Sequence, residues 1–345
     1  MQRVICFLIF ALTIQKTNAQ SFADKLLADS NVTGLQIIYS EKGKITHLNA
    51  GLSDSENKQK VSSNTIFQAA SLSKVVLAYI CLQLADKKRI DLDKPLTRYY
   101  DYPRLKDDSA AKKITARMVL MHTSGLPNWA ENPLKKTWAT SALKTAFKPG
   151  DHWKYSGEGF VYLQLAIQNI LKKDLQQIAD EMVFMPLAMK NSSFIWKDEF
   201  ESVAAFGHDD KAEQTERMPF FLPNAAFSLL TTATDYRIFL NAFYREYLSK
   251  IQSEAVSVYD AKEPKPAAKY LFWGLGIGVQ ENELGKMLWH WGDNGDFQGF
   301  FMINPKKDEI LVCFTNSANG LKLMKPVLIH FFGSRNWPAA SWLSN

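Results

Sequence analysis

Cysteine and several common catalytic sequence patterns are scarce or absent in this chain of 345 residues. It contains three cysteines but no Cys-x-x-Cys pair, which argues against a zinc ribbon or a thioredoxin-type redox centre. It also lacks the Gly-x-Ser-x-Gly nucleophile elbow and the His-Glu-x-x-His zinc motif. The formal net charge is +6, but no lysine or arginine run is long enough to indicate nucleic-acid binding.

Two of the three cysteines fall in segments that the sequence predicts to be buried. Cys81 lies in an apolar helix, and Cys313 lies in the apolar strand Ile310–Phe314. Cysteine is among the residues most often found fully buried. We therefore expect two separate buried thiols rather than a disulfide.

A long apolar stretch without charges stands at the N-terminus. Met1–Arg3 is a short basic start, Val4–Ile14 is apolar, and Thr17–Ala19 supplies small residues before Gln20. The apolar part is too short to span a bilayer comfortably. We interpret residues 1–19 as a cleaved signal peptide, with an uncleaved anchor as the alternative. This predicts an exported protein, periplasmic or secreted, that meets the membrane only during export.

The rest of the chain can form one large domain with strands at both ends and helices between them. With 46% hydrophobic residues, residues 20–345 are long enough to bury a large core. The predicted strands are Gly34–Ser40, Lys44–Leu52, Leu271–Gln280, Lys286–Trp291, Phe297–Ile303 and Ile310–Thr315. The predicted helices after the one that holds Cys81 are Phe160–Leu171, Leu175–Phe184, Asp235–Tyr247 and Leu321–Phe332. This order predicts an α+β fold: an antiparallel sheet flanked by helices, with a mostly helical region of about 90–250 inserted.

The pattern Ser-x-x-Lys occurs four times, and only one copy has an apolar setting. The copies are Ser55/Lys58, Ser71/Lys74, Ser109/Lys112 and Ser141/Lys144. The first and third lie in polar, lysine-rich stretches, and the fourth resembles an ordinary amphipathic turn. Ser71 alone has an apolar run on both sides and is expected to begin a buried helix.

Ser71 and Lys74 have the chemistry of a nucleophile and its base. A serine hydroxyl needs a base within hydrogen-bond reach, and residues three apart share a helix face. A lysine among apolar neighbours tends to lose its proton, so Lys74 can serve as that base. Ser71 would also lie near the positive end of the helix. The alternative is a capped core helix with one lysine that extends to solvent.

Tyr155 is a second candidate, in the segment Trp153–Phe160 that contains two glycines. A tyrosine in such a loop can project into a cleft. A nearby cation would lower its pKa from about 10, which would let it act as a base beside Lys74. The alternative is an aromatic loop residue that packs and donates one hydrogen bond.

His290 is a third candidate, in the strand segment Leu288–Gly292. A histidine at a strand end, followed by a glycine, can face a cleft while the backbone approaches a ligand closely. The alternative is a structural histidine between two tryptophans. A fourth segment, Gly207–Asp210, has residue types found in metal sites, but an exposed acidic turn is the better interpretation, and no metal site is predicted.

These candidates stand in an order that resembles the serine β-lactamase and penicillin-binding superfamily. The resemblance is nearest to the class C β-lactamase-related group, which includes esterases, D-aminopeptidases and D-alanyl-D-alanine peptidases. The motifs that carry it are Phe67–Lys74, Leu92–Pro95, Met121–Pro127, Pro149-Gly150, Tyr155–Gly159, Pro186–Met189, Gly207-His208, Thr231–Asp235, Gly274–Gly276 and His290–Gly292. The resemblance covers most of the mature chain, and the ordered set is far more specific than any single motif.

The resemblance implies roles for individual residues and no metal or other cofactor. Ser71 would form an acyl-enzyme, while Lys74 and Tyr155 transfer its proton. The backbone N–H groups of Ser71 and Asp293 would form the oxyanion hole. His290 would stand at the catalytic position that a lysine holds in class C β-lactamases. The segment that begins at His122 would shape a loop.

Two departures concern substrate recognition at the predicted binding positions Gly157 and Gly292. Class C β-lactamases usually carry Tyr-x-Asn, whose amide helps to hold the acyl side chain, and here that position is Gly157. They also carry Lys-Thr-Gly, and here His290 replaces the lysine that attracts the substrate carboxylate. An unperturbed histidine is mostly neutral at pH 7. Both changes weaken recognition of anionic, amide-bearing β-lactams.

The sequence therefore predicts an exported serine hydrolase that acts on an ester or on an amide of a D-amino acid or peptide. Two alternatives stay open: a genuine β-lactamase or D-alanyl-D-alanine carboxypeptidase, and a penicillin-binding protein that is acylated without turnover. The expected partner is a small ester, peptide or β-lactam, not a nucleic acid.

Overall fold

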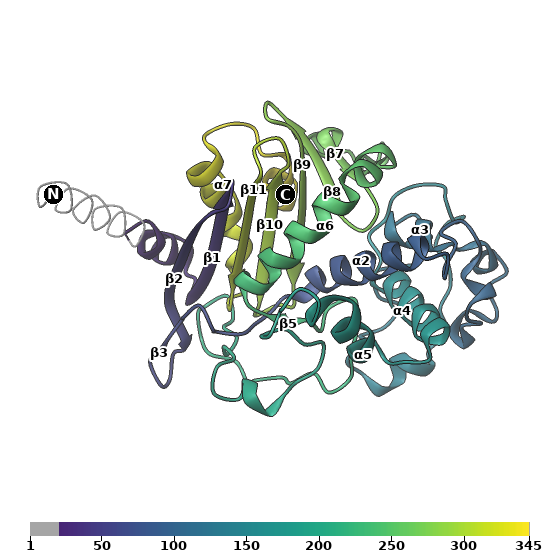
Figure 1. Cartoon of the computed structure of the whole chain (residues 1–345), viewed down its shortest axis with the longest axis horizontal. Helices are drawn as coiled ribbons and strands as arrows, with labels where there is room; N and C mark the ends of the chain where they lie inside the picture. Colours follow the sequence, from purple (N-terminus) through teal and green to yellow (C-terminus); the bar gives the residue numbers. More distant parts are fainter. Residues whose placement is uncertain (1–20, 345) are drawn as a thin grey trace, which may run out of the picture.

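The protein is built on a nine-stranded antiparallel sheet that joins both ends of the chain (Figure 1). The computed structural model describes residues 21–344, so the predicted signal peptide at residues 1–19 lies outside the described part. In spatial order the strands are β3 (Gln59–Lys60), β2 (Lys44–Asp54), β1 (Gly34–Glu41), β11 (Glu309–Thr315), β10 (Gln298–Asn304), β9 (Gly285–Asp293), β8 (Gly278–Asn282), β7 (Leu271–Trp273) and β6 (Val256–Ser257). The predicted α+β class is confirmed.

Helices cover both faces of this sheet, and a larger helical lobe extends from one of them (Figure 1). The helices are α2 (Ser73–Asp86), α3 (Ala116–Leu120), α4 (Gly157–Leu171), α5 (Leu175–Ala179), α6 (Ala233–Ser253), α7 (Met324–Phe332) and α8 (Pro338–Leu343), with one more over residues 21–30. A separate short pair, β4 (Phe67–Gln68) and β5 (Leu230–Thr231), lies beside the sheet. The helix α6 packs against one face, while α7 and α8 pack against the other.

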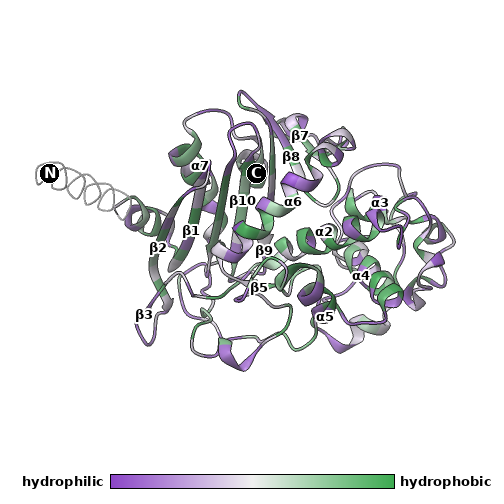
Figure 2. Ribbon diagram, viewed as in Figure 1, coloured by the Kyte–Doolittle hydropathy of each residue, from purple (hydrophilic) through white to green (hydrophobic). Residues whose placement is uncertain are grey.

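Strand β10 shows why the central strands are apolar throughout rather than alternating. Phe300 and Met302 pack in the cluster that contains α7, while Phe301 and Ile303 pack in the cluster that contains α2 and α6. Successive side chains of a strand point to opposite faces. Because both faces are covered, both sets must be apolar. Figure 2 shows the resulting hydrophobic colour on β10 and on α2.

The first two predicted strands are confirmed and form a hairpin, with β1 and β2 joined at Lys42 and Gly43. Both turn residues have positive φ, at +47° and +83°. Two such residues make the tight turn whose twist matches that of paired strands. The predictions for Cys81 and Cys313 are also confirmed, since both are free and buried.

One predicted strand, Leu271–Gln280, is wrong as a single element. It divides into β7 and β8, which pair with each other around a tight turn. Gly276 in that turn has φ +84°, and a Cβ there would lie 2.2 Å from the Cβ of Ala78 in α2. The turn thus needs glycine both for its backbone and for its contact with α2.

The region of about 90–250 contains more irregular structure than the helical periodicity suggested. Long loops occupy much of 121–156 and of 190–229. The predicted helix Leu175–Phe184 divides into α5 and a π-turn at Asp180–Phe184. The predicted helix Leu321–Phe332 begins with a 3-10 turn, and only Met324–Phe332 is α-helical. These loops matter because they border the site described below.

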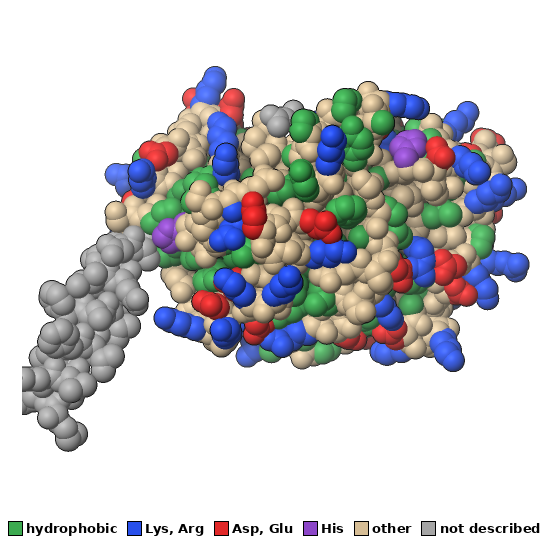
Figure 3. All heavy atoms as spheres, turned by 90° about the horizontal axis from the view of Figure 1, so that it is seen from above, with side chains coloured by type: hydrophobic (Ala, Val, Ile, Leu, Met, Phe, Trp, Pro, Cys, Tyr) green, Lys and Arg blue, Asp and Glu red, His purple; other side chains and the backbone are tan. Residues whose placement is uncertain are grey.

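The surface carries charges of both signs. On the face seen in Figure 3, lysines and arginines are interspersed with acidic side chains rather than gathered into one patch. Within residues 21–344, no helix combines the length and the apolar character that a membrane crossing requires.

Candidate active site

Ser71 lies in a strained turn between the sheet and the helical lobe. The turn Ala70–Leu72 is a 3-10 helix, and α2 begins only at Ser73, so Ser71 precedes the helix that was predicted to begin with it. Ala70 has φ +48°, a conformation that non-glycine residues rarely adopt outside functional sites and turns. The Ser73 hydroxyl stabilises the turn, because it donates to the Ala70 carbonyl at 2.6 Å and accepts from the Leu229 amide at 2.9 Å.

Lys74 lies beside Ser71 and is completely enclosed. Its Nζ is 3.0 Å from the Ser71 hydroxyl oxygen and donates to the Ala226 carbonyl at 2.7 Å. Burial lowers the pKa of Lys74 from 10.5 to about 7, because an apolar surrounding disfavours the ammonium. A substantial fraction of Lys74 is thus neutral near pH 7 and can accept the serine proton.

The other Ser-x-x-Lys copies lack this setting. Lys58, Lys112 and Lys144 are all exposed to solvent, whereas Lys74 is buried. The apolar context in the sequence therefore selected the one buried lysine among the four.

Tyr155 faces this pair, but its pKa moves opposite to the sequence-based expectation. Its ring centroid is 5.0 Å from Lys74 Nζ. Burial raises the pKa of the phenol above its ordinary value, and the nearby Ser71 hydroxyl only partly offsets that rise. Among the described residues the phenol oxygen has no hydrogen-bond partner of good geometry. Tyr155 is therefore a neutral phenol that can donate a proton, and the expected cation effect is outweighed by desolvation.

His122 holds the segment that carries Tyr155, in agreement with its predicted loop-shaping role. Its carbonyl accepts from the Lys154 amide at 2.8 Å, and its Nδ1 accepts from the Ser156 amide at 3.0 Å. The His122 and Tyr155 rings pack with centroids 4.3 Å apart. Burial and the nearby Lys74 lower the pKa of His122 well below its usual value, so the ring is neutral. Hydrogen bonds to His122 thus hold the residue before Tyr155 and the residue after it.

His290 lies on β9 behind Tyr155, with ring centroids 6.1 Å apart. Burial and the nearby Lys74 lower the pKa of His290 to about 3, so the ring is neutral, as the sequence predicted. Its Nδ1 lies 2.6 Å from the Trp291 carbonyl, and a carbonyl only accepts, so Nδ1 carries the hydrogen. Nε2 is left as a buried acceptor with no partner among the described residues.

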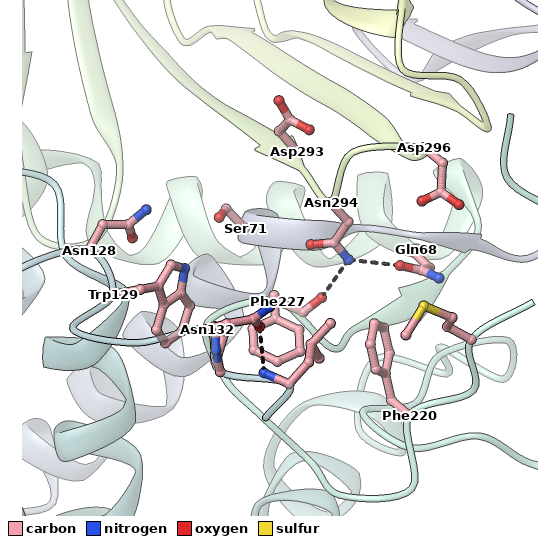
Figure 4. Close-up of a pocket in the computed structure, with 13 residues that line it drawn as sticks. Gln68, Ser71, Asn128, Trp129, Asn132, Phe220, Phe227, Asp293, Asn294 and Asp296 are labelled. Carbon is pink, nitrogen blue, oxygen red and sulfur yellow. Dashed lines mark hydrogen bonds between the residues drawn. The ribbon is translucent and has the colours of Figure 1, made fainter. Parts of the chain in front are cut away.

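The end of β9 brings Gly292 and Asp293 against the Ser71 turn. A Cβ at Gly292 would lie 2.4 Å from the Ala69 carbonyl oxygen and 3.2 Å from the Ser71 amide nitrogen. Only glycine permits this approach, so the predicted binding position Gly292 sets the distance between strand and nucleophile. Asp293 follows and lines the same pocket as Ser71 (Figure 4). The two predicted oxyanion-hole residues are therefore neighbours.

Gly157, the other predicted binding position, lies behind an aromatic side chain that the sequence analysis missed. A Cβ on Gly157 would lie 2.6 Å from the indole of Trp129. An asparagine side chain has no room there, because Trp129 occupies the space. Asn128 orients the same segment, since its Oδ1 accepts from the Gly157 amide at 3.0 Å.

The pocket beside Ser71 has a volume of about 240 Å³ and an aromatic wall (Figure 4). Trp129 packs edge-on against Phe227 at 5.8 Å between ring centroids, and Phe227 packs against Phe220 at 5.5 Å. These three residues come from loops, where no periodicity points to them. Two features of the sequence could have pointed to them as pocket residues. Trp129 lies shortly after the His122–Leu126 motif, and Phe220 lies in an unusually apolar loop.

Charge in this pocket is negative. Of the described residues that line it, the charged ones are Asp293 and Asp296. Burial raises the pKa of Asp296, and the neighbouring carboxylate of Asp293 adds to that rise. An anionic group would be repelled here rather than attracted.

The segment Gly207–Asp210 is only in part the exposed acidic turn that the sequence suggested, because Asp210 is exposed but Gly207 and His208 are buried. His208 is buried, with Nδ1 3.1 Å from the Asn316 carbonyl and Nε2 2.9 Å from the Ser55 hydroxyl. Both ring nitrogens therefore have partners within the protein. Within residues 21–344, no group of three histidine, cysteine or acidic side chains is arranged to hold a metal.

Comparison with known proteins identifies relatives of this chain and of its fold. The profile of the Beta-lactamase family matches residues 19–328. Among curated proteins, the chain is 22% identical over 310 residues to Protein flp of Staphylococcus aureus strain MW2, covering 84% of this chain and 61% of that protein. It is 27% identical over 214 residues to Esterase EstB of Burkholderia gladioli, covering 55% and 54%. The chain thus spans about three fifths, or less, of the length of these relatives.

Two solved structures share the fold. A beta-lactamase/D-alanine carboxypeptidase from Pseudomonas syringae superposes with a TM-score of 0.75 at 19% identity, covering 92% of this chain and 99% of that one. An octameric penicillin-binding protein homologue from Pyrococcus abyssi gives 0.73 at 20% identity, covering 92% and 77%. The resemblance inferred from the motifs is confirmed: the chain belongs to the beta-lactamase family.

Proposed function

We propose that this protein is a serine hydrolase that cleaves neutral carboxylic esters through an acyl-enzyme on Ser71. The observation that carries the proposal is the contact of 3.0 Å between Lys74 Nζ and the Ser71 hydroxyl, with a lysine pKa of about 7. A nucleophile next to a base with that pKa is suited to acyl transfer at neutral pH.

Acylation begins with transfer of the Ser71 proton to neutral Lys74. The serine oxygen attacks the ester carbonyl carbon, and the carbonyl oxygen becomes an oxyanion that the Ser71 and Asp293 amides stabilise. When the intermediate collapses, the C–O bond to the alcohol breaks. The leaving alkoxide takes a proton from Tyr155, whose phenol is neutral, and Lys74 returns a proton to the phenolate. The products of this half-reaction are the free alcohol and the acyl ester of Ser71.

Deacylation repeats these steps with water as the nucleophile. Water gives its proton to the Tyr155 and Lys74 pair and attacks the acyl carbon, and the same amides stabilise the oxyanion. The bond to the Ser71 oxygen breaks, the serine recovers its proton, and the carboxylic acid leaves. His290 contributes no proton, because its pKa of about 3 keeps it neutral throughout.

The preference for a neutral substrate rests on the charges around Ser71. Asp293 and Asp296 repel the carboxylate of a penicillin or of a peptide C-terminus, and neutral His290 offers no attraction. Trp129 occupies the space in which an asparagine side chain at position 157 would bind the amide of an acyl group. These features disfavour β-lactams and D-alanyl-D-alanine peptides relative to esters.

The test compares kcat/KM for p-nitrophenyl butyrate with that for benzylpenicillin, together with mass spectrometry after fluorophosphonate treatment. We expect the ester to be the better substrate by at least about tenfold, and a single adduct on Ser71. Ser71→Ala should lose the adduct and turnover, whereas Ser109→Ala, from an exposed Ser-x-x-Lys copy, should keep both. Faster penicillin turnover contradicts the ester preference, and a stable penicillin adduct without turnover indicates a penicillin-binding protein.

A second candidate is hydrolysis of an amide that carries a free D-amino-acid ammonium group. The observation that favours it is the pair of carboxylates at Asp293 and Asp296, which would attract a cation. Release of p-nitroaniline from D-alanine p-nitroanilide measures this activity. Comparable rates for the L-isomer, or none for either, contradict it.

Export is also part of the proposal, and it rests on the sequence of residues 1–19 alone. If these residues are a cleaved signal peptide, the secreted form begins at Gln20. Mass spectrometry of the mature N-terminus tests this, and a protein that retains Met1 contradicts it.

A further inference from the structure

Two hollows adjoin on one side of Ser71. The first is the active-site pocket, lined in part by Trp129 and Phe227. The second, which we call the outer groove, has a volume of about 670 Å³ and is lined in part by Val161 and Leu165 of α4. Four residues line both hollows: Pro133, Leu134, Phe220 and Phe227. A ligand that fills the pocket therefore reaches the groove across these side chains.

The outer groove is walled mainly by aliphatic and aromatic side chains. Besides the shared residues, these include Tyr102, Trp138, Val161 and Leu165. Three cations also line the groove: buried Arg104 is paired with Glu158 at 2.7 Å, and Lys135 and Lys136 are exposed to solvent. An uncharged, apolar occupant fits this lining.

Several exposed apolar side chains of the described residues gather at the mouth of these hollows. Four of the nine large hydrophobic residues exposed within the described chain line one hollow or both: Leu134, Met218, Phe221 and Leu222. Leu222 and Phe221 are 83% and 72% exposed. A gathering of this kind marks a binding surface more often than chance.

The position of Tyr155 shows which part of an ester would occupy the hollows. The group that protonates the leaving alcohol must lie beside it, and Tyr155 lines neither hollow. The alcohol therefore leaves on the Tyr155 side of Ser71. The acyl part must extend to the other side, over Trp129 and Phe227.

We propose that the preferred substrates are esters of an unbranched fatty acid whose chain fills the pocket and ends in the outer groove. This rests on the proposed function and specifies its acyl group. Each methylene that leaves water on this path stabilises the bound state. The gain corresponds to about a fourfold increase in kcat/KM per fully buried methylene.

The test is a series of p-nitrophenyl esters in which only the acyl chain varies: acetate, butyrate, octanoate and dodecanoate, each below its aggregation concentration. We expect kcat/KM to rise along the series, with dodecanoate at least about tenfold above butyrate. A flat series, or one that falls after butyrate, overturns the proposal.

Two variants locate the effect. In the double variant Phe221→Asp with Leu222→Asp, carboxylates replace the exposed rim of the groove, and the ratio of dodecanoate to acetate kcat/KM should fall about tenfold. Met185→Asp is the matched control, since Met185 is 66% exposed and lines neither hollow. It should leave the ratio unchanged. An equal ratio in all three proteins contradicts a chain in the groove.

Binding of methyl dodecanoate, an uncharged ester, to Ser71→Ala by calorimetry separates this inference from the proposed function. If acetate is hydrolysed and Ser71 is labelled but no chain effect or binding appears, the inference fails and the proposed function stands. If no ester is hydrolysed and Ser71 is never labelled, the proposed function fails and the inference with it. If the rim variants lose binding to phosphatidylcholine vesicles but keep the chain-length series, the apolar rim serves a bilayer and the inference fails.

Discussion

The two sides of Ser71 differ in how the fold holds them. On one side, Lys74, His122, Tyr155 and His290 form what we call the proton-transfer side. Lys74 comes from α2 and His290 from β9. Lys74, His122 and His290 have almost no solvent exposure, and Tyr155 is largely enclosed. On the other side, the active-site pocket and the outer groove are formed largely by the loops 128–138 and 218–227.

This difference follows from what each side has to do. The pKa of Lys74 falls to about 7 only because no water reaches it, so its surroundings must be dense and fixed. A pocket wall has no such requirement and must open to admit a ligand. Dense packing on α2, on β9 and on the segment held by His122 therefore fixes the reacting atoms, while exposed loops determine which molecule reaches them.

The largest effect is expected from removing one oxygen atom on the proton-transfer side. Tyr155→Phe should lower kcat for an alkyl ester such as ethyl butyrate by roughly 10²–10⁴-fold, because its alkoxide leaving group loses its proton donor. The melting temperature should hold or rise slightly, because the buried hydroxyl has no well-formed hydrogen bond to lose. Steady-state kinetics and calorimetry measure the two outcomes.

A matched control for that variant is Tyr79→Phe. Tyr79 lies on α2, and its hydroxyl donates to Glu246 at 2.9 Å. This variant should lose a little stability and keep full activity, the reverse of Tyr155→Phe. If Tyr155→Phe retains more than about a tenth of wild-type kcat, Tyr155 is not the proton donor.

The second-largest effect is the pH dependence of Ser71 reactivity, which also arises on the proton-transfer side. The base must be neutral Lys74, so the rate at which a fluorophosphonate labels Ser71 should fall about tenfold per pH unit below about 7 and level off above it. His290, with a pKa of about 3, and His122, with its strongly lowered pKa, stay neutral over this range and add no second step. An apparent pKa near 10 would mean that Lys74 keeps its proton and is not the base.

The proton-transfer side was largely predictable from the sequence, and the pocket side was not. Ser71 and Lys74 are adjacent because a spacing of three residues, across the 3-10 turn and the start of α2, places their side chains together, and the apolar run predicted the burial of Lys74. Tyr155 is distant in sequence, and only the motif order linked it to them. Its pKa was expected to fall, but desolvation, which depends on tertiary packing, raises it.

The pocket residues carry no comparable local signal. Trp129 fills the space beside Gly157 because two segments 28 residues apart pack together, as the Asn128 to Gly157 hydrogen bond shows. No helical or strand period connects them. The strand predicted at 271–280 failed for a similar reason, since the turn at Gly276 is determined by its contact with Ala78. Both features are determined by packing between segments distant in sequence, which local sequence patterns do not reveal.

The smallest effect on activity is expected from loosening the pocket side while leaving the proton-transfer side intact. Buried Glu158 pairs with Arg104 and also accepts from the Ala130 amide at 3.1 Å and the Trp138 indole at 2.9 Å. It thereby fastens the loop that carries Trp129. Glu158→Gln leaves Arg104 buried without a counter-charge and should cost about 3–5 kcal/mol of stability. The ester KM should rise a few-fold, with the rate of Ser71 labelling nearly unchanged.

Glu181→Gln is the control, because it removes the carboxylate of a solvent-exposed pair with Lys173. Exposed pairs contribute at most about 1 kcal/mol, so its melting temperature and KM should stay near wild type. If Glu158→Gln slows Ser71 labelling as much as it raises KM, the pocket side and the proton-transfer side are coupled through α4. The loops and the reacting groups would then not be positioned independently. If labelling holds while KM rises, the nucleophile is assembled independently of the loop that presents the substrate.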